Sequence, residues 1–399
     1  MRNSLEILGN DRKLGPVSAI SAKIGAHGRF CAEAILGSPS GTLFDTSHLA
    51  EPYLVEEKRG DSMEISLMMP THGLLYRDEA NAFLAVPDIR IDVVAVARLA
   101  EALDYHSVWF SDHVCMTRSS DSGHPANWSG TRAYPGRAYM LDALVGMGAV
   151  AAVTTRIRIA PSVLISPYRH PLSDARQLAT IDVISNGRLI VGVGAGWMKE
   201  EFDVLGLPFD ARGRMLNECV QIYRKSWLDE WVNFDGEFYQ FNDVSMDPKP
   251  VQQPPPIVFG AATQAGARRA AQWGNGLYLL FLDPYPDPYR YGLLHETVKR
   301  EMEGHGRDFD QFEFSVMVSA LPTDAHDPLA QASKRRALTG TAEQIASDIE
   351  QFAKAGYSRC VIHLEVRSGT FAEYMELVQR FGEEVTPLAH QIPCRAPSL

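Results

Sequence analysis

The chain has 399 residues, and its composition, 45% hydrophobic and 22% charged, is that of an ordinary globular protein. Lys and Arg number 38 against 49 Asp and Glu, which gives a formal net charge of −11 and argues against nucleic acid as a partner. An anionic cofactor is compatible with this charge, because backbone amides bind phosphate without a basic patch.

The five cysteines are scattered along the chain and form no Cys-x-x-Cys pair, so we expect neither a disulfide framework nor a metal site. No apolar run approaches the roughly 20 residues of a membrane span. The N-terminus also lacks the residue order of a secretory signal. These features predict a cytoplasmic protein with no membrane partner.

The first part of the chain differs from the rest. Residues 1–62 follow neither helical nor strand periodicity for long, whereas a regular apolar strand begins at Met63. We therefore predict that 1–62 is an N-terminal extension, poorly ordered or peripheral, and that 63–399 is the folded domain. A start codon assigned too far upstream would produce the same pattern.

From Met63 onward, apolar runs typical of strands alternate with stretches of helical periodicity. The predicted strands are 64–69, 107–111, 156–165, 188–194, 256–260, 276–281, 312–320 and 358–366. The predicted helices are 90–104, 139–153, 171–184, 209–230, 264–273, 287–304, 342–355 and 370–386.

This alternation predicts an α/β protein, and eight strands is the number that closes a parallel TIM (β/α)8 barrel. An open doubly wound sheet is the alternative. It needs a glycine-rich turn after its first strand, whereas such a turn occurs here at Gly192, after the fourth. Residues 232–241 are typical of a hairpin around Asp235-Gly236. We place this hairpin as an insertion after the fourth strand, between the fourth helix and the fifth strand.

Function in such a barrel lies at the C-terminal ends of the strands. The second strand ends at Asp112-His113, two side chains that can reach a cavity and position protons, or that only cap and pack. Pro161 interrupts the third strand, so we expect a distortion that extends to Ser162-Val163. Such a distortion serves a ligand or only adjusts curvature.

The fourth strand ends in the glycines of 192–196, which would let a planar ligand or its phosphate approach, or would only permit strand-to-helix packing. Glu201 follows at the start of a helix, and we expect it to form a structural ion pair with Arg212 or Arg214. The fifth strand runs through residues 260–263 into a helix, whose first amides suit a phosphate. A plain Thr N-cap is the alternative there.

Three other polar or aromatic residues are notable. His72 follows the first strand and is a candidate to line a substrate cavity. His363 lies inside the eighth strand, where we expect a core histidine. Tyr285 belongs to an aromatic cluster that forms either the lid of a pocket or the cover of a loop.

A series of short motifs spread over about 63–366 carries a family resemblance. The motifs are Arg156-Ile157-Arg158-Ile159, Ser166-Pro167-Tyr168-Arg169-His170-Pro171, Ile184-Ser185-Asn186-Gly187-Arg188-Leu189, Gly192-Val193-Gly194-Ala195-Gly196-Trp197, Pro248-Lys249-Pro250 and Gly260-Ala261-Ala262-Thr263. As an ordered set they resemble the luciferase-like monooxygenase family. The resemblance is greatest to the branch that uses the deazaflavin coenzyme F420, with the FMN-using branch close behind.

The resemblance implies a TIM barrel with an insertion, in agreement with the strand count. It implies that Asp112 and His113 stand where deazaflavin enzymes contact the coenzyme and place a proton-transfer histidine. It also implies a non-proline cis peptide at Ser162-Val163 that presses against the flavin ring. The coenzyme-binding residues that it implies, including the phosphate-binding turn, are Ser162, Val163, Ala195, Gly196, Glu200, Gly260, Ala261, Ala262 and Thr263.

Two departures from the family pattern concern substrate and coenzyme. Trp197 stands where some sugar-phosphate-oxidising members carry a catalytic Glu, which argues against that substrate class. The turn that is often Gly-Gly is Gly260-Ala261 here, and the Ala still offers its amide to a phosphate. For the substrate itself we expect contacts from His72, Trp197 and Tyr285.

These observations predict an oxidoreductase that transfers a hydride between coenzyme F420 and a small organic substrate. One alternative is an FMN-dependent monooxygenase that uses reduced flavin and O2, with a flavin reductase as its partner. A second alternative is a non-catalytic flavin-binding protein. We further expect a homodimer.

Overall fold

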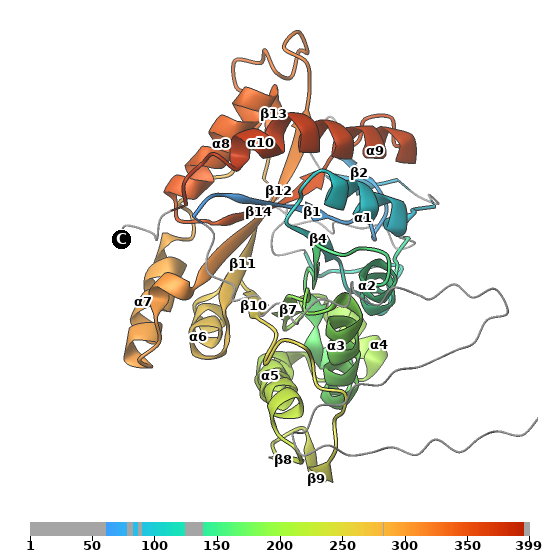
Figure 1. Cartoon of the computed structure of the whole chain (residues 1–399), viewed down its shortest axis with the longest axis vertical. Coiled ribbons are helices and arrows are strands. Elements are labelled where there is room, and N and C mark those ends of the chain that lie inside the picture. Colours follow the sequence, from blue (N-terminus) through green and yellow to red (C-terminus); the bar gives the residue numbers. More distant parts are fainter. Residues whose placement is uncertain (1–60, 78–82, 87–89, 124–138, 282, 395–399) are drawn as a thin grey trace, which may run out of the picture. The chain divides into compact units, whose positions relative to one another are not determined.

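The computed structural model describes residues 61–77, 83–86, 90–123, 139–281 and 283–394, in which strands and helices alternate (Figure 1). The strands are β1 Glu64–Met68, β2 Leu75–Arg77, β3 Phe83–Ala85, β4 Ser107–Phe110, β5 Arg158–Pro161, β6 Leu164–Ile165, β7 Val191–Gly194, β8 Val232–Asp235, β9 Gln240–Val244, β10 Ile257–Gly260, β11 Gly276–Phe281, β12 Glu313–Pro322, β13 Thr339–Gly340 and β14 Arg359–Leu364. The helices are α1 Val93–Ala102, α2 Ala143–Ala151, α3 Pro171–Ser185, α4 Lys199–Leu205, α5 Arg212–Leu228, α6 Gln264–Trp273, α7 Gly292–Gly304, α8 Ala342–Lys354, α9 Phe371–Arg380 and α10 Thr386–Ala389.

The predicted N-terminal extension, 1–62, lies outside the described residues except for its last two. Among the helices of the described ranges, none is both long and apolar enough to cross a membrane.

Nine strands form a nearly closed parallel barrel, in the order β5-β4-β1-β14-β12-β11-β10-β7-β6. The first and last members of this order, β5 and β6, are the two halves of the third predicted strand. β5 pairs with β4 and β6 pairs with β7, while a bridge between Ile159 and Leu189 joins β5 to the approach of β7. The prediction of an eight-stranded barrel is therefore confirmed, with one of its strands divided.

The division falls at Ser162 and Val163, whose connecting peptide is cis, as the family resemblance implies. The distortion expected from Pro161 in the strand predicted over 156–165 is confirmed, and it divides that strand, because β5 pairs with β4 whereas β6 pairs with β7. The predicted insertion is confirmed as the antiparallel pair β8–β9, which Figure 1 shows beyond α5 and away from the barrel strands.

Three short strands were not predicted. β2 and β3 form an antiparallel pair of three residues each, and β13 adds two residues beside β12. Runs of two or three residues are too short for a period to be visible in a sequence. All three lie near the C-terminal ends of β1 and β12, which is the end of the barrel where the cavity opens.

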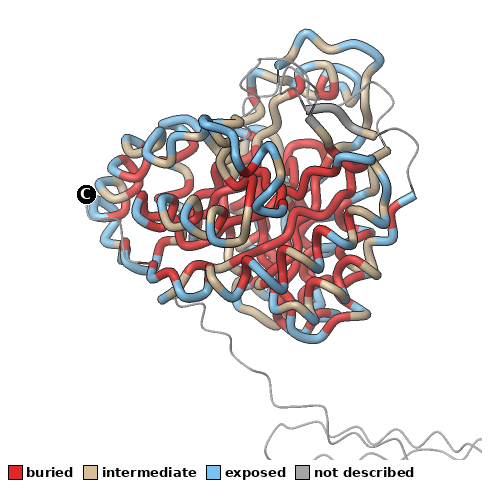
Figure 2. The backbone as a smooth tube through the Cα atoms, turned by 90° about the horizontal axis from the view of Figure 1, so that it is seen from above, coloured by how far each residue is buried: buried red, intermediate tan, exposed pale blue. Residues whose placement is uncertain are grey.

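The barrel strands are buried on both faces, as Figure 2 shows, because helices cover the outside and side chains fill the inside. Successive residues therefore point to opposite sides. On β4, Trp109 belongs to the interior cluster, whereas Val108 and Phe110 pack in the layer between strands and helices. The Trp109 ring stacks on Tyr278 of β11, with ring centroids 4.8 Å apart, and so fills the middle of the barrel.

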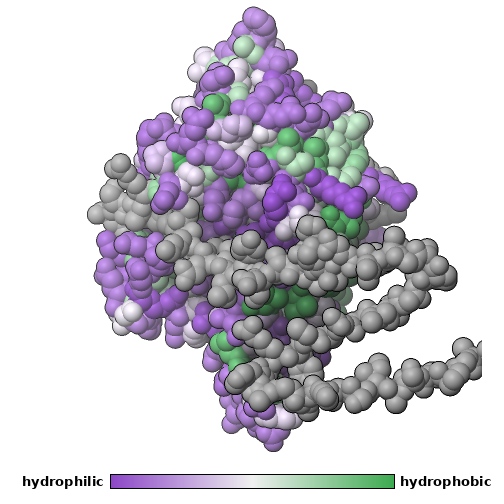
Figure 3. Space-filling model, viewed as in Figure 1, coloured by the Kyte–Doolittle hydropathy of each residue, from purple (hydrophilic) through white to green (hydrophobic). Residues whose placement is uncertain are grey.

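Local sequence signals set where the helices begin. Thr341 and Gln344 form the reciprocal capping box at the start of α8, and Pro171 occupies the first position of α3. The face visible in Figure 3 is mainly hydrophilic, as expected for the outward sides of these helices.

Candidate active site

A cavity of about 660 Å³ opens at the C-terminal ends of the barrel strands, where the fold places function. Most of the residues predicted for the site line it. These are His72, Asp112, His113, Ser162, Val163, Ala195, Gly196, Trp197, Gly260, Ala261, Ala262 and Thr263. The structure therefore brings together segments from β1, β4, the β5–β6 break, β7 and β10.

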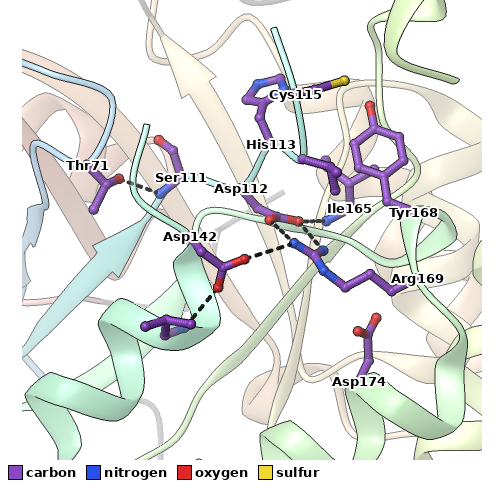
Figure 4. Close-up of polar contacts among 12 residues, drawn as sticks. Thr71, Ser111, Asp112, His113, Cys115, Asp142, Ile165, Tyr168, Arg169 and Asp174 are labelled. Carbon is purple, nitrogen blue, oxygen red and sulfur yellow. Dashed lines mark hydrogen bonds and ion pairs between the residues drawn. The ribbon is translucent and has the colours of Figure 1, made fainter. Parts of the chain in front are cut away.

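Asp112 is held by an arginine from the segment that follows β6. Both of its carboxylate oxygens accept from Arg169, at 2.6 and 2.9 Å, and Oδ2 also accepts the backbone N–H of Ile165 (Figure 4). The Asp112 side chain has no exposed area. A carboxylate that is buried and paired in this way fixes the loop geometry.

His113, the next residue, interacts with a different carboxylate. Its Nδ1 lies 2.7 Å from Oε2 of Glu201, which comes from the first turn of α4. The prediction that Glu201 pairs with Arg212 or Arg214 is wrong. Those arginines contact the carbonyl of Gly196 and the carboxylate of Glu237 respectively, because Glu201 points inward from α4 and is completely buried.

Glu201 accepts hydrogen bonds on both oxygens. Oε1 accepts the backbone N–H groups of Val114 and Cys115, at 2.6 and 3.0 Å, and Oε2 also accepts the Tyr168 hydroxyl at 2.8 Å. Burial by itself raises the pKa of Glu201, but the bonds from His113, Cys115 and Tyr168 outweigh burial and leave this pKa lowered. Glu201 is therefore an anion inside the protein.

The negative charge of Glu201 changes the pKa values of two neighbouring groups, Tyr168 and Cys115. Burial, and then the charge of Glu201, raise the pKa of the Tyr168 phenol well above its ordinary range. The same two causes raise the pKa of the Cys115 thiol. Both groups remain protonated near neutral pH, so Glu201 is the charge beside His113.

Val163 occupies the middle of the cavity wall, immediately after the break between β5 and β6. A Cβ placed on Gly194 would come within 2.5 Å of Val163 Cγ2, and one on Gly260 within 2.9 Å of its Cγ1. At Gly192, a Cβ would lie 2.1 Å from the carbonyl oxygen of Pro161. The glycines of β7 thus make room for the broken strand, and Gly194 also lines the cavity.

One end of the cavity has the features of an anion site. Thr263 caps α6, its side chain accepting from the N–H of Gly266, and residues 260–263 lead the cavity to this helix start. Two arginines that the sequence analysis did not select, Arg212 and Arg269, also line the cavity. Burial, and then the charge of Arg212, lower the pKa of Arg269, so these cations lie close enough to repel one another. An anion there would relieve the repulsion.

The opposite part of the cavity is lined from β1, β12 and β14. His72 and His363 stack with ring centroids 5.4 Å apart, and Nδ1 of His72 lies 2.9 Å from the Ser111 hydroxyl. Both histidines are buried and line the cavity. His363 is therefore a wall residue of the cavity as well as a buried one, whereas the sequence favoured a role in the core. Apolar residues complete this end, among them Met68 and Met317.

Two residues predicted for the site lie elsewhere. Glu200 faces the segment that follows β4, where its Oε1 accepts the backbone N–H groups of Asp121 and Ser122. Burial opposes its ionisation, but these and neighbouring bonds lower the pKa of Glu200 to about 2. Tyr285 is 44% exposed and lies under the ammonium group of Lys334, away from the lining residues.

Sequence reasoning did not assign Glu201, Arg169, Arg212 or Arg269 to the site, and it gave Glu201 only a structural ion pair with Arg212 or Arg214. Three of the four have partners far along the chain: Glu201 contacts a histidine 88 residues away, Arg169 an aspartate 57 residues away and Arg269 an asparagine 52 residues away. Arg212 bonds the carbonyl of Gly196, 16 residues away. The only local signal was that Glu201 occupies a buried position in an otherwise amphipathic helix turn, beside Phe202. Periodicity could therefore have indicated its burial, but not its partner.

Comparison with known proteins covers most of the described chain. Residues 63–384 match the model of the luciferase-like monooxygenase family. An uncharacterized protein of Mycobacterium bovis is 36% identical over 192 residues, which is 48% of this chain and 66% of the relative, just under two thirds. An F420-dependent glucose-6-phosphate dehydrogenase of Amycolatopsis mediterranei is 27% identical over 333 residues, 74% of this chain and 93% of the relative. An FMNH2-dependent dimethylsulfone monooxygenase of Pseudomonas putida is 38% identical over 127 residues, 31% of this chain and 34% of the relative.

Solved structures with the same fold include both coenzyme types. An F420-dependent secondary alcohol dehydrogenase in complex with an F420–acetone adduct superposes with a TM-score of 0.61 at 19% identity, covering 82% of this chain and 99% of that one. The oxygenating constituent of 3,6-diketocamphane monooxygenase from Pseudomonas putida, in complex with FMN, gives a TM-score of 0.62 at 15% identity, covering 84% and 100%. These two likenesses show the barrel fold. The match of the family model over 63–384 establishes that the chain belongs to the luciferase-like monooxygenase family.

Proposed function

We propose that the protein is an oxidoreductase that binds coenzyme F420 in this cavity and catalyses hydride transfer between the coenzyme and a small organic substrate. The observation that carries the proposal is the arrangement of one cavity. It has an anion site at the start of α6, a valine wall at its middle and a histidine backed by a buried carboxylate beside that wall.

The residues present fit a phosphate-bearing deazaflavin. The first amides of α6 and the cations Arg212 and Arg269 would hold the phosphate, which would reduce the repulsion between the two cations. Val163 would support the ring from the strand break, and Trp197 would help to exclude water. When bound, the coenzyme supplies the ring carbon that accepts or donates the hydride.

The chain's own residues would then act on the substrate. His113 lines the cavity and would take up or return the substrate proton, while Asp112 and Arg169 keep the His113 loop in place. His72 and His363 line the end of the cavity that lies away from the anion site, and they would meet the polar part of the substrate. The remaining wall there is apolar, which favours a compact and largely hydrocarbon substrate.

The preference for F420 over FMN is supported by the length of the matches. The F420-dependent relative matches over 74% of this chain, whereas the FMNH2-dependent relative matches over 31%. The identity of 38% in that shorter segment is nonetheless the reason to keep an FMN-dependent monooxygenase as the second candidate. The Glu201–His113 pair argues against a protein that only binds a flavin, since it positions a base in the cavity. The homodimer and the flavin reductase partner stay predictions.

A titration of the full-length protein tests the choice of coenzyme. Oxidised F420 and FMN are added separately, and binding is followed by coenzyme fluorescence. We expect saturable F420 binding with a Kd at least about tenfold below that for FMN, a difference of about 1.4 kcal/mol. Tight FMN binding without F420 binding would replace the proposal with the monooxygenase. If neither coenzyme bound, the whole assignment of the cavity would fail.

A further inference from the structure

We propose that Glu201 is the positioning residue that holds the proton of neutral His113 on Nδ1, and thereby makes Nε2 the nitrogen that exchanges protons with the substrate. The reaction that Nε2 would serve rests on the proposed function. The protonation of the ring does not, because it follows from contacts within the chain.

Glu201 receives two backbone N–H groups on Oε1, from Val114 at 2.6 Å and from Cys115 at 3.0 Å, and backbone amides can only donate. Oε2 lies 2.8 Å from the Tyr168 hydroxyl and 2.7 Å from His113 Nδ1. The side chain has no exposed area, so these partners replace water entirely. An ionised carboxylate satisfies all four contacts, since it accepts only.

The protonation of His113 follows from that ionisation. Because Oε2 has no proton to donate, the short contact to Nδ1 is a hydrogen bond only if Nδ1 carries a hydrogen. A neutral imidazole has one N–H, so its Nε2 is then an acceptor. When Nε2 takes up a second proton, the imidazolium cation forms next to an anion that is already in place.

The groups around His113 leave Glu201 as the decisive charge. Asp112 is adjacent in sequence, but its charge is compensated by Arg169 through two bonds at 2.6 and 2.9 Å. Cys115 and Tyr168 stay neutral because burial and Glu201 raise the pKa of each. Trp197 meets the ring edge-on, with centroids 6.0 Å apart, and is uncharged.

In the proposed reaction, written for an alcohol, the substrate O–H bond breaks and its proton goes to Nε2. The hydrogen of the neighbouring C–H bond would leave with its electron pair, for which the deazaflavin, when bound, would be the acceptor. The alcohol would thus be oxidised by two electrons to a carbonyl, and both electrons would go to the coenzyme. In the reverse sense, the imidazolium returns the proton to the carbonyl oxygen.

The substitution Glu201→Gln gives a sharp test. Its carbonyl oxygen must face the two backbone N–H groups that Oε1 now accepts, which places its NH2 group beside His113. That NH2 would donate to Nδ1, so the ring proton would move to Nε2. The ring nitrogens of His113 are observed by 15N-correlated NMR on the coenzyme-free, full-length protein. We expect the Nδ1–H tautomer in the wild type and the Nε2–H tautomer in Glu201→Gln.

A second variant tests the proposal even if Glu201→Gln fails to fold. Tyr168→Phe removes one donor from Oε2 but leaves the carboxylate, so His113 should keep the Nδ1–H tautomer. An Nε2–H ring in the wild type, or a changed tautomer in Tyr168→Phe, would overturn the proposal. In coenzyme-loaded protein, Glu201→Gln should lower kcat by about 10²-fold or more while the coenzyme Kd changes less than about threefold. A lack of coenzyme binding would overturn the proposed function but not the tautomer assignment, which is measured without coenzyme.

Discussion

Asp174 shows how a single buried side chain can couple this site to pH. It lies in the first turn of α3, near the guanidinium of Arg169 that holds Asp112 (Figure 4). Oδ2 accepts from the hydroxyl of Tyr223 at 2.8 Å, whereas Oδ1 has no hydrogen-bond partner among the described residues. Burial raises the pKa of Asp174 to about 7, although Arg169 and Tyr223 act against it.

The sign of the resulting pH dependence is fixed by this pKa. The folded protein holds the Asp174 proton more tightly than the unfolded chain, whose carboxyl has a pKa near 3.8. Stability is therefore lost as pH rises from about 4 to about 7, and the loss stays constant above that. The difference between the folded and unfolded pKa values corresponds to a loss of about 4 kcal/mol at most in the free energy of unfolding. We expect Asp174→Asn to be more stable than the wild type at pH 8 by a few kcal/mol, and to differ little from it at pH 4.

Denaturant unfolding at pH 4, 6 and 8 measures this difference. Asp203→Asn is the matched control, because Asp203 is an exposed partner of Lys199 and should not change the pH slope. The prediction would be contradicted if the free energy of unfolding changed with pH in the same way in the wild type and in Asp174→Asn.

Sequence reasoning at the residue scale found which side chains reach the cavity, but not what each one does there. Asp112 and His113 were predicted as one catalytic unit because they are neighbours in the chain. In the structure their partners are Arg169 and Glu201, from different elements. Hydrogen-bond partners across a closed barrel depend on side-chain directions in three dimensions, and the sequence periodicity encodes only burial.

At the scale of elements, the break between β5 and β6 is matched by the small residues of β7 and β10. Val163 lies between them, and Gly194 cannot carry a Cβ without displacing Val163 Cγ2 at 2.5 Å. Overpacking of this kind costs about 1–3 kcal/mol. We expect Gly194→Ala to lower the free energy of unfolding by this amount, and to raise the coenzyme Kd because Val163 moves.

A double-mutant cycle checks the cause. Val163→Ala removes the atom that Gly194→Ala would meet, so the two changes together should cost less than the sum of their separate effects. Gly148→Ala, in the middle of α2 with nothing within 4 Å, is the control and should be neutral or slightly stabilising. If the effects of the Val163 and Gly194 substitutions were strictly additive, the contact between these two residues would not be the cause of the lost stability.

The elements most accessible to sequence reasoning were the long ones. All eight predicted strands exist, since runs such as β4 and β14 are buried on both faces and therefore read as continuous apolar segments. The predicted Asp235-Gly236 hairpin also exists, because its turn chemistry is local. The cis peptide came from the family resemblance alone, whereas Pro161 indicated locally that the strand is distorted where β5 ends.

At the scale of the whole molecule, the net charge of −11 opposes the binding of an anionic coenzyme. Affinity must then come from cations close to the ligand, since exposed charges more than about 10 Å away are largely screened at 0.1 M salt. We expect Arg269→Gln to raise the coenzyme Kd about tenfold, because Arg269, in the middle of α6, is half-buried in the cavity wall close to Arg212.

Arg268 offers a control with the same change of net charge. It is the neighbouring residue, but it is 56% exposed and lies 3.5 Å from Glu301 on α7. Fluorescence titration of Arg268→Gln should give the wild-type Kd. If both variants weakened binding equally, overall charge rather than the local site would be responsible. The wild-type Kd should also rise more steeply with salt than that of Arg269→Gln.

Because β1 and β14 are neighbours in the barrel, their pairing determines when the cavity is complete during synthesis. Glu64 to Leu67 pair with Arg359 to Ile362, so β1, the first of the described strands, can be enclosed only after β14, the last of them, has left the ribosome. His72 and His363 reach their stacked arrangement through the same pairing. A nascent chain that already contains residues 260–263 and α6 would still lack the opposite cavity wall, which β1, β12 and β14 form together. The α6 end of the cavity is thus made before β14, whereas the wall that would contact the substrate is complete only after β14 has been made.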